Sequence, residues 1–182
     1  MDGRDNNMAS TLTLLCDEPD LRYRMTAVCG LPEEVIARCA REFQVPFWTT
    51  DYRALVTRAR LQPGETVLIT GIGGGVATMA LLIARHLGAR VIVTSASDAK
   101  LARASQLGAD GGANYRRDDW GKQVQALCDG GPEVIVDSAG RDAFPTLLDI
   151  VKPGGRIVTF GATTGSPSTI EIRRIFWKQV SI

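Results

Sequence analysis

Residues 65–90 read ETVLITGIGGGVATMALLIARHLGAR, and this run carries the strongest structural signal in the chain. Residues 66–70 form a short apolar, β-branched segment, which is the composition of a strand buried on both faces. Glycines follow at positions 71, 73, 74 and 75, and apolar residues then recur at helical spacing until Gly88. A strand, a glycine turn and a helix in this order bring unpaired backbone N–H groups and the positive end of a helix dipole to one point, where a pyrophosphate would bind.

The spacing of these glycines differs from the simple G-x-G-x-x-G fingerprint. Gly71, Gly74 and Ala77 fall at G-x-x-G-x-x-A, a longer turn in which Ala77 takes the position where a small residue permits close packing of helix on strand. A glycine-rich turn with a purely structural role is the alternative interpretation. The strand before the turn and the helix after it favour phosphate binding.

Length and composition exclude several broad classes of protein. A chain of 182 residues is long enough for one well-buried domain with a short extra segment. The net charge is +1, so nothing indicates a nucleic-acid or anionic-membrane partner. No apolar run reaches the roughly 18 residues of a spanning helix, and the N-terminus lacks the basic-then-apolar layout of a signal peptide. The sequence therefore predicts a cytoplasmic protein without a membrane partner.

Cysteine and histidine residues are too scattered to predict a metal site. The four cysteines, at positions 16, 29, 39 and 128, form no C-x-x-C pair, and the single histidine, His86, lies in the helix predicted after the glycine turn. A zinc site needs about four clustered ligands, so we predict no metal site and reduced, mostly buried thiols. We interpret His86 as a residue of the helix surface rather than a catalyst, because it lies about three turns beyond the glycine turn.

Strand-like and helix-like segments alternate strictly after residue 90. The predicted strands are residues 91–94, 109–115, 134–136 and 156–160, and the predicted helices are residues 99–107, 118–128 and 144–151. This order predicts an α/β fold, a doubly wound parallel sheet with helices on both faces. Small residues follow the last two strands, as expected where a ligand lies across the carboxyl ends of the sheet.

Residues 1–44 show no recognisable chemistry. We predict a short strand at residues 11–15, an amphipathic helix at residues 31–43 and, beyond this segment, a second helix at residues 49–59. The chain is thus divided into a short, partly helical N-terminal extension over residues 1–44 and a dinucleotide-binding domain over residues 45–182.

The residues at the end of the predicted strand 91–94 indicate which dinucleotide is bound. An acidic side chain at this point would bind the two ribose hydroxyls of NAD, and this sequence has Ser95 instead. Ser95, Ser97 and Lys100 form a neutral-to-positive pocket that would accept a 2′-phosphate, so NADP is favoured over NAD. Alternatively, Ser97 or Asp98 caps the next helix and Lys100 is a solvated first-turn residue, and both interpretations can hold together.

A series of motifs stands in a characteristic order over about residues 45–182. They are TDYRAL, LQPGETVLI, the GxxGGVA loop, SxxK, LGAD followed by NY, VDSAG, VKPGGRIVTFG and FWKQ. This combination resembles the nucleotide-binding domain of the medium-chain dehydrogenase/reductase superfamily, in its quinone-oxidoreductase-like branch. The resemblance implies a Rossmann domain that binds NADP(H) for hydride transfer to a small-molecule carbonyl, quinone or enone substrate.

The resemblance also implies binding roles for individual residues, and it assigns no catalytic residue. Thr50 matches a residue near the nicotinamide ribose. The pyrophosphate loop would comprise Gly74, Gly75 and Val76. The positions that hold the adenosine 2′-phosphate are matched by Ser97, Lys100 and Tyr115, and the strand ends beside the cofactor by Ser138, Phe160, Gly161 and Ala162.

Two departures from the family pattern leave two classes of function open. Family members begin with a GroES-like catalytic domain, and residues 1–44 are too short and too helical to be one. The chain also stops at Ile182, on what resembles the start of a sixth strand, which predicts a homodimer or aggregation through an unpaired sheet edge. The chain thus belongs either to an NADP(H)-dependent oxidoreductase or to a dinucleotide-binding or interaction module without turnover.

Overall fold

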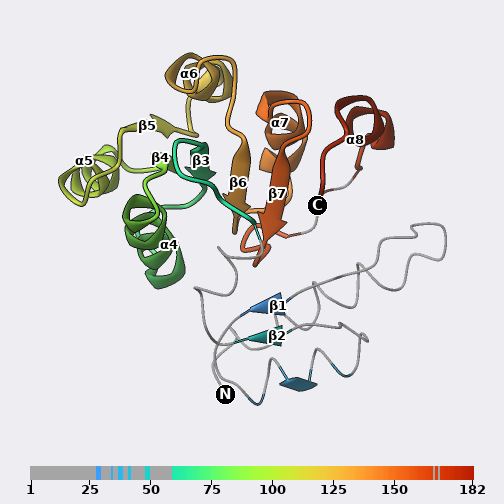
Figure 1. The fold of residues 1–182 in the computed structure, drawn as a ribbon, viewed down its shortest axis with the longest axis horizontal. Coiled ribbons are helices and arrows are strands. Elements are labelled where there is room, and N and C mark those ends of the chain that lie inside the picture. Colours follow the sequence, from blue (N-terminus) through green and yellow to red (C-terminus); the bar gives the residue numbers. More distant parts are fainter. Residues whose placement is uncertain are drawn as a thin grey trace.

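The computed structural model describes residues 59–182 apart from residues 166 and 168, together with residues 28–29, 34, 37–38, 41 and 48–49 (Figure 1). The expectations for residues 11–15 and for Thr50 lie outside the described residues. Residues 34, 37–38 and 41 are helical, in agreement with the helix predicted over residues 31–43.

A two-stranded parallel ladder lies before the main sheet in the chain. It consists of β1 (Val28–Cys29) and β2 (Trp48–Thr49), and Cys29 lies opposite Thr49. The helix was predicted to begin at Thr49. This start is wrong, because Thr49 is the last residue of β2 and pairs with Cys29. Ala59, its predicted last residue, lies in a turn.

The main sheet has five parallel strands in the order β5-β4-β3-β6-β7. Its strands are β3 (Thr66–Ile69), β4 (Arg90–Ser95), β5 (Gly111–Asn114), β6 (Val134–Asp137) and β7 (Arg156–Thr159). The chain first winds from β3 outward to β5 and then crosses to β6 on the other side of β3. This reversal creates a topological switch point between β3 and β6, where open α/β sheets bind their ligands.

Helices cover both faces of this sheet, which confirms the predicted doubly wound fold (Figure 1). The helices α4 (Gly75–His86) and α5 (Asp98–Gln106) pack on one face, and α6 (Trp120–Leu127) and α7 (Ala143–Ile150) on the other. Alternate side chains of β3 enter the two cores: Ile69 belongs to the same core as Leu81 of α4, whereas Leu68 belongs to the same core as Leu147 of α7. Both faces of the strand are buried, which is why its sequence is an uninterrupted apolar run.

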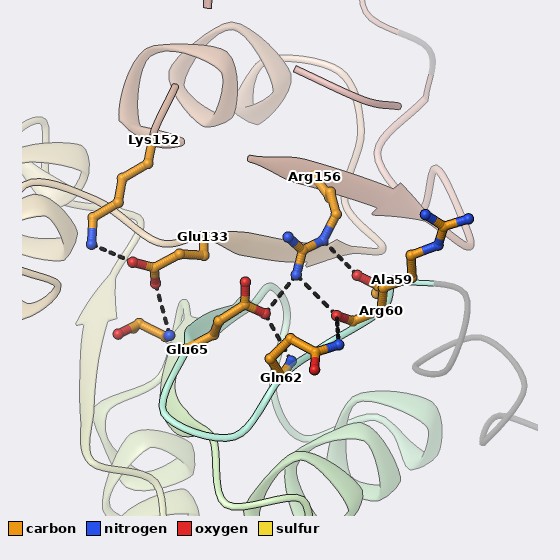
Figure 2. A network of polar contacts seen from close by, with 8 residues as sticks. Ala59, Arg60, Gln62, Glu65, Glu133, Lys152 and Arg156 are labelled. Atoms are coloured by element: carbon orange, nitrogen blue, oxygen red, sulfur yellow. Dashed lines mark hydrogen bonds and ion pairs between the residues drawn. The ribbon is translucent and has the colours of Figure 1, made fainter. Parts of the chain in front are cut away.

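A network of polar contacts closes the end of the sheet at which β3, β6 and β7 begin (Figure 2). We call it the basal network; its members are Ala59, Arg60, Gln62, Glu65, Thr66, Glu133, Lys152 and Arg156. The Arg156 guanidinium donates to the carbonyl oxygen of Ala59 at 2.6 Å and pairs with the Glu65 carboxylate at 2.5 Å. These contacts attach the segment that enters β3 to the first residue of β7.

Glu133 joins the other half of the basal network. Its carboxylate pairs with Lys152 and accepts a hydrogen bond of 2.8 Å from the backbone N–H of Thr66. Partial burial alone would raise the pKa of Glu133, but the hydrogen bonds from Lys152 and Thr66 outweigh it, and the pKa lies below its usual value.

We expect Arg156→Met to lower the free energy of unfolding by about 2 kcal/mol, because it removes the guanidinium that donates to the carbonyl oxygens of Ala59 and Arg60 and pairs with Glu65. Denaturant-induced unfolding measures the loss. Arg90→Met is the matched control: Arg90 pairs with Asp129, whose side chain is 88% exposed, and such surface pairs contribute less than about 1 kcal/mol. Equal losses in the two variants would contradict a stabilising role for the basal network.

The last helix, α8 (Ile172–Lys178), was not expected from the sequence pattern. Ile172, Ile175 and Phe176 stand at helical spacing, but the helix has only seven residues and none of them is buried. Instead, Lys178 attaches α8 to the end of α7, where its ammonium group donates to the carbonyl oxygens of Leu148, Asp149 and Val151.

Beyond α8, Ser181 forms a parallel bridge with Arg156 of β7, at the position that a sixth strand would take. Pairing of two copies along this edge stays a prediction. Each helix in the part of the chain that the structure describes is too short or too polar to cross a bilayer.

Candidate dinucleotide-binding site

The turn between β3 and α4 leaves the first N–H groups of α4 open. Gly71 and Gly73 have φ angles of +67° and +111°, which side chains other than glycine rarely adopt. Gly74 is the N-cap residue, it makes no side-chain cap hydrogen bond, and the first turn of α4 carries no acidic residue. Nothing lies within 4 Å of the places that a Cβ would take on Gly74 and Gly75. A negatively charged group can therefore approach the positive end of α4 closely.

A cavity of about 540 Å³ lies directly in front of this helix N-terminus. Its walls come from the carboxyl ends of four strands: Thr70 follows β3, Thr94 is in β4, Ser138 follows β6 and Phe160 follows β7. The volume is typical of small-molecule and cofactor sites. The cavity occupies the switch point between β3 and β6, so the topology and the open helix end point to the same place.

Six of the residues expected to bind the cofactor line this cavity, namely Gly74, Gly75, Val76, Tyr115, Ser138 and Phe160. The lining does not include Ser95, Ser97, Lys100, Gly161 or Ala162. Thr50 lies outside the described residues. The structure thus brings the residues predicted at the glycine turn and at the ends of β6 and β7 together around one space.

The three residues expected around a 2′-phosphate have different surroundings. Ser95 is buried, and its hydroxyl accepts a hydrogen bond from the N–H of Ser97 at 3.2 Å. Ser97 caps α5, because its hydroxyl accepts from the N–H of Lys100 at 3.4 Å. The alternative interpretation, in which Ser97 caps the next helix, is therefore confirmed.

Lys100 lies over the glycine turn rather than pointing away from it. A Cβ on Gly73 would lie 2.7 Å from Cδ of Lys100 and 3.3 Å from its ammonium nitrogen Nζ. The side chain is otherwise exposed. Its positive charge adds to that of the α4 N-terminus, and both favour an anionic ligand at this corner.

The end of β6 is organised by a buried carboxylate, that of Asp137, which is fully inaccessible to solvent. Its Oδ1 atom accepts hydrogen bonds from the hydroxyl of Thr70 at 2.7 Å and from the N–H of Ala139 at 3.0 Å, and Oδ2 accepts from the N–H of Gly140 at 3.1 Å. Burial raises the pKa of Asp137, while these hydrogen bonds oppose the rise.

The loop that follows β7 is hydrogen-bonded to the turn that follows β6. Thr163 donates to the carbonyl oxygen of Ser138, and Thr164 to that of Ala139, each through both its N–H and its hydroxyl group. In return, the N–H of Arg141 donates to the carbonyl oxygen of Gly165 at 2.8 Å. Both threonines line the cavity, so this pairing fixes its far wall.

Sequence reasoning missed several residues of the cavity wall, namely Thr70, Thr94, Trp120, Asp142, Thr163 and Thr164. Trp120 lines the cavity from the start of α6 and also packs partly against the core around α7. A general signal for the threonines was present, because each lies at or just beyond the carboxyl end of a predicted strand.

No cluster of three or more metal-binding side chains occurs among the residues that the structure describes. Cys128 is buried, and loss of hydration raises the pKa of its thiol to about 11, so it stays protonated at neutral pH. His86 is exposed near the end of α4, in agreement with its interpretation as a surface residue.

A glycine turn between a buried strand and an uncapped helix, at the switch point of a doubly wound parallel sheet, defines a Rossmann-type dinucleotide-binding domain. The family model described as zinc-binding dehydrogenase matches residues 75–182, more than half of the chain. The chain belongs to this family, within the medium-chain dehydrogenase/reductase superfamily.

Individual relatives extend over similar parts of the chain. A zinc-type alcohol dehydrogenase-like protein, YogA, from Leptosphaeria maculans is 42% identical over 122 residues, which cover 64% of this chain and 34% of that protein. The solved structure of an NAD-dependent alcohol dehydrogenase superposes with a TM-score of 0.68 at 38% identity, over 72% of this chain and 38% of that one. A quinone oxidoreductase from Thermus thermophilus, solved also in complex with NADPH, gives a TM-score of 0.63 at 28% identity over 71% and 41% of the two chains. The chain thus spans between 34% and 41% of the length of these three proteins.

Proposed function

We propose that this chain is the NADP(H)-binding domain of an oxidoreductase that transfers hydride between the cofactor and a small carbonyl, quinone or enone substrate. The observation that carries the proposal is the cavity of about 540 Å³ in front of the uncapped N-terminus of α4. The nicotinamide ring supplies the hydride chemistry when the cofactor is bound. The protein supplies binding, orientation and exclusion of water.

The residues present fit such a cofactor. The N–H groups of Gly74, Gly75 and Val76 would hold the pyrophosphate, because no side chain covers the first two and the helix dipole favours the charge. The strand ends at Ser138, Phe160, Gly161 and Ala162 would lie beside the nicotinamide half. Thr50 would lie near its ribose, as the family resemblance implies.

The choice of NADP over NAD rests on the end of β4. An acidic residue at the position of Ser95 would repel a 2′-phosphate, and the serine does not. Lys100 adds a positive charge beside the glycine turn. Ser97 and Tyr115 complete the proposed phosphate pocket, and Tyr115 is 46% exposed at the edge of the cavity. The complex of the Thermus thermophilus relative with NADPH supports the same choice.

Calorimetric titration of the purified chain with NADPH and with NADH tests this function. We expect NADPH to bind at least tenfold more tightly, a difference of about 1.4 kcal/mol. Failure of both nucleotides to bind would overturn the proposal, and equal affinities would overturn its choice of NADP.

The second candidate function is a dinucleotide-binding module without turnover. The same cavity and uncapped helix end support this candidate, because binding of a dinucleotide there does not require turnover. Oxidation of NADPH by a simple quinone, followed in the calorimetry sample, separates the two candidates. Binding without oxidation would favour the module, whereas sustained turnover would favour the oxidoreductase.

Replacing Trp120 with alanine is expected to weaken NADPH binding by about five- to tenfold, because an aromatic wall of the cavity is lost. Trp177→Ala is the matched control, since Trp177 is 79% exposed on α8 and does not line the cavity. Its dissociation constant should change less than about twofold. Similar losses in both variants would show that Trp120 does not contact the nucleotide.

A further inference from the structure

Thr70 and Asp137 form a buried pair between the two central strands, at the floor of the cavity. The Thr70 hydroxyl donates to Oδ1 of Asp137 at 2.7 Å and accepts a hydrogen bond from the N–H of Ser138 at 2.9 Å. Thr70 comes directly after β3, and Asp137 is the last residue of β6. One hydroxyl group therefore links the strand that enters the glycine turn to the strand that carries the opposite wall.

The Asp137 carboxylate belongs to none of the ion pairs found within the described part of the chain. It is held by the Thr70 hydroxyl and by backbone N–H groups of the turn that follows β6. A fully buried carboxyl group without hydrogen-bond partners is costly, so loss of these contacts is opposed. The carboxylate thus determines the conformation of residues 138–140.

The turn at residues 138–140 is hydrogen-bonded to the loop at residues 161–165. The carbonyl oxygens of Ser138 and Ala139 accept hydrogen bonds from Thr163 and Thr164. The space is tight, because a Cβ on Gly140 would lie 2.6 Å from the carbonyl oxygen of Gly165. The contacts run without interruption from Thr70, through Asp137 and the turn, to a loop on the far wall of the cavity.

We propose that Thr70 and Asp137 are positioning residues that hold the 138–141 turn and the 161–165 loop in the arrangement that binds the dinucleotide. The hydroxyl of Thr70 makes both contacts to the end of β6, because it donates to the Asp137 carboxylate and accepts from the N–H of Ser138. The binding part of this inference rests on the proposed function, whereas the effect on the two loops does not.

The test compares three substitutions in and beside β3. Thr70→Val removes the hydroxyl and keeps the shape, Thr70→Ser keeps the hydroxyl, and Thr66→Val makes the same change at the other end of the strand. Thr66 is also buried, and its side chain makes no hydrogen bond with the described residues. Any general cost of replacing threonine by valine in this strand appears in Thr66→Val.

The first measurement is amide hydrogen exchange without nucleotide. In Thr70→Val we expect exchange at Ser138, Thr163 and Thr164 to accelerate by about tenfold, the change that one lost hydrogen bond produces. Thr70→Ser should restore the wild-type rates, and Thr66→Val should leave these amides unchanged. Unchanged exchange at the two threonines in Thr70→Val would overturn the inference, whatever the protein binds.

The second measurement is the dissociation constant for NADPH, together with unfolding by denaturant. We expect Thr70→Val to weaken binding by about tenfold, and Thr66→Val to leave it within twofold even if both variants lose the same stability. A loss of affinity that followed stability in all three variants would overturn a positioning role. If the wild-type chain bound no nucleotide, the proposed function would fail, and the exchange experiment would still decide the inference.

Discussion

Gly131→Ala is expected to lower the free energy of unfolding by about 4 kcal/mol or more, enough to leave much of the chain unfolded. Gly131 lies between α6 and β6 with a φ angle of +140°. A Cβ at this position would lie 2.0 Å from the carbonyl oxygen of Ile150, the last residue of α7. The obstacle is backbone rather than a flexible side chain, so α7 and β6 would have to separate. Denaturant unfolding monitored by circular dichroism measures the loss.

The neighbouring glycine supplies the control for this prediction. Gly130 has a φ angle of +99°, but nothing lies within 4 Å of the place that its Cβ would take. Gly130→Ala therefore introduces the same kind of backbone strain without a collision between Cβ and a carbonyl oxygen. Strain alone costs about 1–3 kcal/mol. Equal destabilisation of the two variants would show that α7 does not pack against Gly131 as described.

The central part of the fold could be predicted because its signals are local. The apolar run of β3, the glycines after it and the helical spacing of α4 lie within residues 65–90, and each is decided by neighbours in sequence. The alternation of the later strands and helices then leaves few topologies, and the observed parallel sheet is the expected one. Helix α8 escaped prediction because its seven residues are too short a run for the helical period to stand out.

The polar contacts around the cavity could not be predicted in the same way. Thr70 and Asp137 are 67 residues apart, and no pattern in the sequence indicates that a carboxylate is buried without a cation. The same holds for Arg156 and Glu65, which are 91 residues apart. Such pairs depend on strand register, which sets which residues meet at each end of the sheet.

The site could be predicted where residue type follows from position in the fold. Small residues were expected beside a ligand at the ends of β6 and β7, and Ser138 does line the cavity, whereas Gly161 and Ala162 do not. Ser95 and Ser97 show the limit of this reasoning, because their hydroxyls are engaged in the turn before α5. Lys100 is the residue of this group whose charged end approaches the glycine turn, so the choice of cofactor depends most on this side chain.

We expect Lys100→Ala to weaken NADPH binding by about 10- to 100-fold and NADH binding by less than about twofold. The ammonium group would pair with the 2′-phosphate, which NADH lacks, so the loss should be specific to the phosphorylated cofactor. Added salt should reduce the difference between wild type and variant, because an exposed charge pair is screened. Titration of both cofactors at low and high ionic strength measures these effects.

Lys122→Ala is the matched control, because Lys122 is an exposed lysine on α6 that does not line the cavity. The same net charge is removed, so any general effect of charge on binding an anion appears in this variant too. Equal losses for NADPH and NADH in Lys100→Ala would place the ammonium group at the pyrophosphate instead, where Nζ already lies beside Gly73. A loss confined to NADPH would place it at the 2′-phosphate.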